Sequence, residues 1–168
     1  MDTETDRKAP RRLQAPNAFD DFYRRSWHEI YRPLAATIGD VQLASEAVDE
    51  AMVRAYVKWR SVRKMSNAEG WVYRVAYRWS IDQLRRRTRE RKLLPRLLEH
   101  PDAQSPAVEP GLSSALDALP IEQRAVVVLA CAFDWSHNEI AGALGIRPGT
   151  VKSRLHRGLE HLRKEMNA

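Results

Sequence analysis

The sequence predicts an all-α protein made of two small helical domains joined by a Pro-rich linker, the C-terminal one a helix-turn-helix. Apolar residues recur at steps of three and four along most of the chain, which is the helical period. No segment alternates apolar and polar residues between hairpin turns, so a sheet is not expected. Four prolines from Pro95 to Pro110 interrupt the helical pattern. We therefore expect a flexible tail at 1–17, a helical domain at 18–92, a linker at 93–111 and a second helical domain at 112–168.

A long apolar face predicts the first helix. It begins at Phe19 and reaches Leu34 in steps of three and four residues. Gly39 is placed to end this helix, because glycine readily adopts a positive φ. Pro33 lacks the backbone N–H of a helix interior, so it is expected to kink or divide the helix.

Two further helices complete the first domain. The inner stripe of the second runs from Val41 through Tyr56 to Trp59, and Val53 lies among acids on the opposite face. Residues 40–50 include four acids and no base, which suits a protein contact better than DNA. After a polar break, a third helix is predicted over 68–91.

Residues 136–162 have the pattern of a helix-turn-helix. Ser136 and Glu139 are spaced as a capping box, which marks the start of a helix. Ala141 is small enough for a second helix to approach, Gly145 is placed in a tight turn, and Val151 is placed to pack the second helix. The inner stripe of that helix is predicted to be Val151, Leu155, Leu159 and Leu162.

Charge favours an acidic partner. The net charge is +6 and the pI is near 9.8. The segment from Trp71 to Lys92 contains eight arginines or lysines, two acids and several aromatic residues. Arginines neutralise phosphates, and Tyr and Trp rings stack on unpaired bases. We interpret this helix as a nucleic-acid surface; a solvated arginine face around core tryptophans is the alternative, and we prefer the core interpretation for Trp71.

Other classes of site are not favoured. Cys131 lies in an apolar run, so it is expected to be buried in a protein of the reducing cytosol. His137, His156 and His161 lack the spacing of metal ligands, so neither a metal nor a cofactor is expected. No nucleophile–base pair or phosphate-binding glycine loop predicts catalysis. No apolar stretch is long enough for membrane insertion, and no signal peptide is recognised, which predicts a cytoplasmic protein.

Two segments resemble the same family. WVYRVAYRWSIDQLRRR resembles the promoter-melting, −10-recognition helix of bacterial extracytoplasmic-function sigma factors, and ALPIEQRAVVVLACAFDWSHNEIAGALGIRPGTVKSRLHRGLEHLR resembles their −35-recognition domain. The resemblance covers about 19–91 and 112–164, in the family's order. It implies a helical transcription initiation factor that binds core RNA polymerase, recognises promoter DNA and promotes melting.

The resemblance also implies roles for particular residues. Those matching the segment that docks on the polymerase β′ clamp are Glu46, Asp49, Glu50, Arg54 and Trp59. Those matching the −10 surface are Arg74, Tyr77, Arg78, Trp79, Asp82, Arg85 and Arg86, and the loop at 63–68 matches one that holds a flipped base. Those matching the −35 surface are Arg147, Thr150, Lys152, Ser153, Arg154 and Arg157. A contact with the β flap and an anti-sigma partner are also implied.

Two positions depart from the family pattern. Members usually carry Asn where Arg78 stands and often Gln where Asp49 stands. The first departure bears on the −10 sequence that is recognised, and the second on the clamp contact.

Two other functions compete with this interpretation. A free-standing helix-turn-helix regulator would need a sensing pocket or phosphoacceptor in the first domain and a dimer on a palindrome. The acidic second helix and the arginine-rich third helix argue against it. An enzyme acting on nucleic acid would need a carboxylate cluster for metal ions, which the sequence does not indicate.

Overall fold

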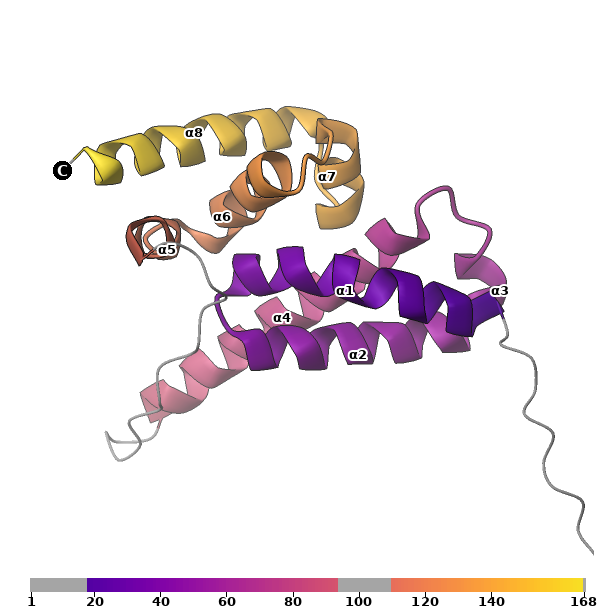
Figure 1. Ribbon diagram of the computed structural model, residues 1–168. Coiled ribbons are helices and arrows are strands. Elements are labelled where there is room, and N and C mark those ends of the chain that lie inside the picture. Colours follow the sequence, from indigo (N-terminus) through magenta and orange to yellow (C-terminus); the bar gives the residue numbers. More distant parts are fainter. Residues whose placement is uncertain (1–17, 94–109, 168) are drawn as a thin grey trace, which may run out of the picture.

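The computed structural model describes residues 18–93 and 110–167, and every regular element within these ranges is helical (Figure 1). The all-α prediction is thereby confirmed. The predicted tail and most of the predicted linker lie outside the described residues. The elements are α1 (Ala18–Ile38), α2 (Val41–Val57), α3 (Trp59–Val62), α4 (Ala68–Leu93), α5 (Pro110–Asp117), α6 (Ile121–Val127), the π-helix η1 (Val128–Ala132), α7 (His137–Leu144) and α8 (Pro148–Met166).

The N-terminal domain is a bundle in which α1, α2 and α4 pack on one another. Leu34, Leu43 and Val72 contribute one fully buried side chain from each helix. Gly39, with φ of +72°, follows the last residue of α1, as predicted. Asp40 then begins α2, because its Oδ1 accepts the Leu43 N–H at 2.9 Å. Helix α1 runs unbroken through Pro33, so the predicted division there is wrong.

The C-terminal domain contains the predicted helix-turn-helix, formed by α7 and α8. Ser136 and Glu139 form the capping box: the Ser136 N–H donates to Oε2 of Glu139 at 2.8 Å, and the Glu139 N–H donates to Oγ of Ser136 at 3.3 Å. Gly145 ends α7 in the left-handed region, with φ of +69°. Pro148 opens α8, where its missing N–H costs no hydrogen bond.

Three predictions of burial are wrong. Leu159 is 40% exposed, because Gly158 is the residue of α8 that faces α6 closely. Tyr56 is 59% exposed and lies on the outer side of α2. Cys131 is exposed, since the π-helical turn of η1 buries Val128 and Leu129 and leaves the cysteine outside.

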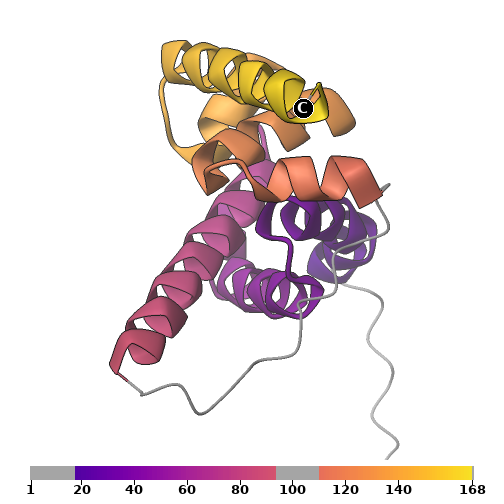
Figure 2. The same cartoon turned by 90° about the vertical axis from the view of Figure 1, so that its left-hand side faces the viewer.

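The two domains pack directly on each other. Figures 1 and 2 show the C-terminal helices lying across one side of the N-terminal bundle. Helix α7 contacts α4, and α6 and η1 contact α1. One continuous apolar core therefore joins the domains, with Tyr73 of α4 meeting Trp135 of the loop before α7 at 5.4 Å between ring centroids.

We predict that Gly158→Ala destabilises the C-terminal domain. A Cβ at this position would lie 2.6 Å from Cγ2 of Val127, so either the Val127 side chain or α8 must shift. The expected loss is about 1–3 kcal/mol in the free energy of unfolding, measured by urea denaturation. Gly142→Ala is the matched control, because no atom lies within 4 Å of its added Cβ and alanine favours helix. Equal stability of the two variants would contradict the close packing.

Candidate nucleic-acid and polymerase interfaces

Helix α4 is fixed at its start and along its inner face. Asn67 accepts the Gly70 N–H through Oδ1 at 2.6 Å and the Trp71 N–H through its carbonyl at 3.2 Å. Tyr73 is fully buried, with its phenol oxygen 3.3 Å from Oγ1 of Thr37. Since Thr37 donates its own proton to the Pro33 carbonyl at 2.8 Å, Tyr73 is the donor in this pair. Burial raises the pKa of the Tyr73 phenol, which stays protonated.

The outer side of α4 carries exposed arginines. Arg78, Arg85 and Arg86 are exposed, as is Asp82. Arg87 instead turns back to α2, where its Nη1 lies 3.0 Å from Oδ2 of Asp40. Among the three consecutive arginines, Arg87 is therefore held by Asp40 at the start of α2, whereas Arg85 and Arg86 remain on the exposed outer side of α4.

The remaining predicted −10 residues lie deeper. Arg74 and Trp79 are half-buried, and Tyr77 is 9% exposed. The pKa of Tyr77 is raised to about 12, mainly by burial and also by the charge of Glu122, while Arg154 and Arg85 act in the opposite direction. The C-terminal domain thus covers one side of the predicted −10 surface.

Helix α8 presents hydrogen-bond donors on its outer side. Within the predicted −35 set, Arg147, Lys152, Ser153 and Arg157 are exposed, and Thr150 and Arg154 are half-buried. The Ser153 hydroxyl donates to the Thr150 carbonyl at 3.1 Å, and Arg157 Nε donates to the Ser153 carbonyl at 3.2 Å. Guanidinium and ammonium groups at the start of a helix suit phosphates and the acceptor edges of bases in a major groove.

The predicted clamp residues lie along α2 and the start of α3. Glu46, Asp49 and Arg54 are exposed, and Glu50 and Trp59 are half-buried. Asp49 accepts the indole N–H of Trp27 at 2.8 Å, and Glu50 pairs with Arg54 at 2.8 Å. Trp59 packs against the rings of Phe19 and Phe22, at centroid distances of 5.3 and 5.1 Å. Its role in the fold is therefore to close the end of the bundle.

Sequence reasoning missed an apolar strip on α2. Val53, Tyr56 and Val57 are 61%, 59% and 77% exposed. Steps of three and four residues place Val53 and Val57 on the same side of the helix as Glu46 and Glu50. We define these seven positions, Glu46, Asp49, Glu50, Val53, Arg54, Tyr56 and Val57, as the α2 surface. Exposed apolar patches of this kind mark interaction sites. In the sequence, the position of Val53 and Val57 beside the acids was the signal that could have indicated this surface.

Neither a metal centre nor a membrane segment emerges from the described parts of the chain. Residues 18–93 and 110–167 contain no group of three or more His, Cys, Asp or Glu that could hold a metal ion. None of the helices in these ranges is long and apolar enough to cross a membrane.

Comparison with known families matches both domains. The Sigma-70 region 2 family matches residues 16–90, and the Sigma-70 region 4 family matches residues 111–162. The RNA polymerase sigma-E factor of Streptomyces coelicolor is 31% identical over 153 residues, covering 89% of this chain and 86% of that protein. The chain belongs to the ECF RNA polymerase sigma factors. Sigma factors direct RNA polymerase to promoters.

Other relatives agree with this assignment. The ECF RNA polymerase sigma factor SigE of Mycolicibacterium smegmatis is 34% identical over 158 residues, which cover 87% of this chain and 60% of that protein. In fold, the chain is similar to the sigma factor RpoE of Bartonella quintana, solved in complex with the anti-sigma factor NepR. That match has a TM-score of 0.71 and 23% identity, and covers 89% of this chain and 97% of that one. CnrH, solved with the cytosolic domain of CnrY, has a TM-score of 0.62 and 21% identity over 92% of this sigma factor and 90% of CnrH.

We predict that the capping box makes stability depend on pH. Hydrogen bonds from the Ser136 side chain and backbone lower the pKa of the Glu139 carboxyl. A lowered pKa in the folded state means that Glu139 stabilises the fold above its ordinary carboxyl pKa, and that this contribution is lost as the pH falls through the folded value. The stability difference between the wild type and Glu139→Gln, from urea unfolding at pH values from about 7 to about 3, should shrink on acidification. Gln keeps an acceptor for the Ser136 N–H but does not titrate. A constant difference across this range would contradict the prediction.

Proposed function

We propose that this ECF sigma factor binds core RNA polymerase through the α2 surface, contacts the −10 element through α4 and contacts the −35 element through α8. The observation that carries the proposal is the α2 surface, where acids and exposed apolar side chains share one side of a helix. Such a surface is costly to leave in water and unsuited to DNA, so it requires a protein partner. We propose that this partner is the β′ clamp, as the family resemblance implies.

The α2 surface combines two kinds of contact. Its apolar half, with Val53 and Val57 more than 60% exposed, supplies area for burial against a partner helix. Its acidic half, at Glu46 and Asp49, is exposed and suits basic residues of the clamp. The acids attract basic residues of the clamp, and the valines bury apolar area against it. Together these contacts favour one defined position of α2 on the polymerase.

Helix α4 is proposed to hold the melted −10 element. Its exposed arginines, Arg78, Arg85 and Arg86, supply positive charge for the phosphates of a single strand. Tyr77 and Trp79 offer rings on which unpaired bases stack, and the loop at 63–68 is proposed to hold a flipped base. Melting is favoured because open strands gain contacts that the duplex cannot make.

Helix α8 is proposed to enter the major groove at the −35 element. Its N-terminal residues reach base edges in the usual docking of a helix-turn-helix, and Lys152, Arg154 and Arg157 supply charge for phosphates. The polymerase raises the affinity of this small domain, because binding of both domains to one enzyme makes the second DNA contact intramolecular.

Further partners follow from the same proposal. The C-terminal domain is expected to contact the β flap, and an anti-sigma factor is expected, since the structurally similar sigma factor RpoE was solved in complex with the anti-sigma factor NepR. The proposal involves binding without covalent catalysis, and it places the protein with the polymerase in the cytoplasm.

We predict that the double variant Arg85→Ala/Arg86→Ala loses promoter-dependent transcription. Run-off transcription with bacterial core polymerase on fragmented DNA of the source organism should give discrete transcripts that require the protein. These transcripts should fall about tenfold or more in the double variant, because two phosphate contacts are removed. Arg24→Ala/Arg163→Ala removes the same charge from exposed positions outside the proposed surfaces and should retain activity. Absence of transcripts with the wild type, together with tight DNA binding by the protein alone, would instead support a free-standing regulator.

A second prediction concerns the polymerase. Val53→Glu/Val57→Glu should weaken binding to core polymerase by about tenfold or more, because charges replace the apolar half of the α2 surface. The measurement is a titration of labelled protein with core polymerase. Met65→Glu, which changes another exposed apolar residue but lies in the loop before α4, should bind core normally. Equal binding by all three proteins would refute the assignment of α2.

A further inference from the structure

The α2 surface lies beside the point where residues 1–17 join the described fold. Helix α1 begins at Ala18, and the ring of Phe19 meets the ring of Tyr56 at 65°, with the centroids 5.1 Å apart. Figure 1 shows the start of α1 at the same end of the bundle as the end of α2 and as α3. The chain therefore enters the N-terminal domain next to the apolar part of the α2 surface.

Side chains of α1 extend this surface. Tyr23 is 39% exposed, and burial and, to a smaller extent, the charge of Asp49 raise the pKa of its phenol, which places Tyr23 and Asp49 near each other. The indole N–H of Trp27 donates to the Asp49 carboxylate at 2.8 Å. Asp49, Val53 and Tyr56 follow one another at steps of four and three residues, so they share this side of α2. An exposed apolar strip thus leads from the start of α1 to an acidic group.

The chain before α1 is complementary in charge to this surface. Residues 7–17, which we call the basic segment, contain no acid and four bases, Arg7, Lys8, Arg11 and Arg12. Residues 40–50 contain four acids and no base, and Glu46 and Asp49 among them are exposed. Leu13 directly follows the second pair of bases. The basic segment therefore combines cations with an apolar side chain, and these are the two kinds of group that the α2 surface binds best.

The basic segment is long enough to reach these groups. Six residue steps separate Arg12 from Ala18, and an extended chain covers about 20 Å in six steps at roughly 3.3 Å each. Along α2, seven residue steps separate Asp49 from Tyr56, which is about 10 Å at roughly 1.5 Å per residue. Arg12 can therefore meet Asp49 when the segment folds back along α2.

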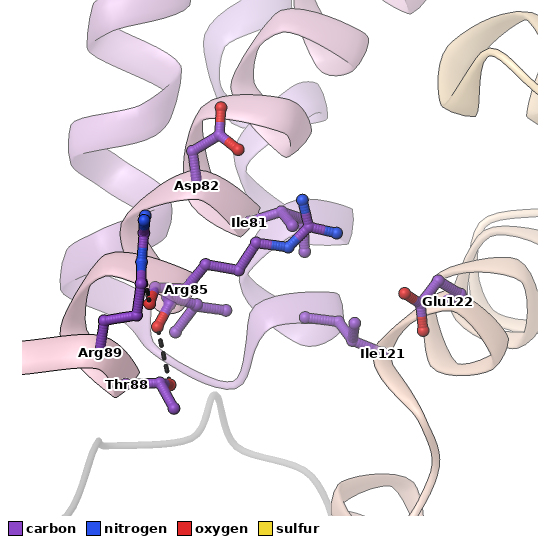
Figure 3. Close-up of a pocket in the computed structure, with 8 residues that line it drawn as sticks. Ile81, Asp82, Arg85, Thr88, Arg89, Ile121 and Glu122 are labelled. Atoms are coloured by element: carbon purple, nitrogen blue, oxygen red, sulfur yellow. Dashed lines mark hydrogen bonds between the residues drawn. The ribbon is translucent and has the colours of Figure 1, made fainter. Parts of the chain in front are cut away.

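Other surfaces suit the basic segment less well. Lys58 and Arg60, at the start of α3, are exposed cations that repel it, which directs it along α2. A hollow of about 600 Å³ between α4 and α6 is lined by as many acids as arginines, namely Asp82, Glu122, Arg85 and Arg89 (Figure 3). Figure 1 places this part of α4 at the opposite end of the bundle from the start of α1.

We propose that the basic segment binds the α2 surface of the same chain in the free protein, and that core polymerase must displace it. Arg11 and Arg12 pair with the acids of that surface, and Leu13 packs on its exposed apolar side chains. A tether this short gives an effective concentration of about millimolar, so a weak contact is enough to occupy the surface. The competition with polymerase rests on the proposed role of α2, whereas the docking of the segment does not.

Disulfide trapping in the full chain tests the docking. With Cys131→Ser to remove the native thiol, Leu13→Cys is combined with either Val53→Cys on the α2 surface or Ser61→Cys on α3. Ser61 is the matched control, because it is exposed and lies in α3, which contacts the start of α1 through the ring of Trp59. A segment without preference would reach the two positions equally.

We expect the cysteines at 13 and 53 to form an intramolecular disulfide in oxidised glutathione at least about fivefold faster than those at 13 and 61. Adding Arg11→Glu/Arg12→Glu should remove this difference, because the acids of α2 then repel the segment. Equal rates for the two pairs would overturn the docking. A disulfide between two chains would also overturn it and would assign the surface to a second copy.

Titration with core polymerase measures the competition. Arg11→Glu/Arg12→Glu should bind core about threefold to tenfold more tightly than the wild type, because the α2 surface is then free in more of the molecules. Arg163→Glu/Lys164→Glu makes the same change in net charge at the end of α8 and should bind as the wild type does. Unchanged or weaker binding by Arg11→Glu/Arg12→Glu would overturn the competition, since a segment that contacts polymerase directly favours binding.

The two measurements separate this inference from the proposed function. Equal disulfide rates, together with normal binding to core polymerase, would overturn the docking and leave the function of α2 intact. A preference for position 53 in a chain that does not bind core polymerase would contradict the proposed function, and the competition with it, but would support the docking.

Discussion

The structure depends on the burial of one side of α4 around Tyr73. Tyr73 donates to Thr37 of α1, stacks on Tyr77 and meets Trp135 from the C-terminal domain. Helix α4 is therefore packed by α1 and α2 from one side and by α7 from another. The first packing builds the N-terminal domain, and the second joins the two domains. Only the arginine-bearing side of α4 remains open to solvent.

Local signals in the sequence were sufficient to predict most of the helices. Gly39 and Gly145 both adopt a positive φ and follow the last residues of α1 and α7, because the turn geometry depends on the residue itself. Burial was harder to predict where helices pack closely. Leu159 continues the apolar period of α8, but Gly158 faces Val127, and the helix is rotated so that Leu159 points outward. Such a rotation depends on a neighbour distant in sequence.

Periodicity alone could not predict the docking of the domains. The Trp135–Tyr73 contact joins residues on two separate helical patterns, and the loop that carries Trp135 follows a π-helical turn that no propensity indicates. For the same reason the sequence predicts Tyr77 as a DNA contact but does not predict that the C-terminal domain buries it. The resemblance implied a polymerase-binding role for α2, and the sequence placed Val53 among its acids, but the exposure of Tyr56 and Val57 became evident only in the structure.

Helix α4 packs against the chain's own C-terminal domain, and the proposed function gives it promoter DNA as a second partner. The most direct test replaces Tyr77 by the photo-crosslinker benzoylphenylalanine. In the free protein the crosslink should join α4 to the C-terminal domain, and in the complex of polymerase with an open promoter it should join α4 to the single strand. Crosslinking to the C-terminal domain in both states, with none to DNA, would contradict the account.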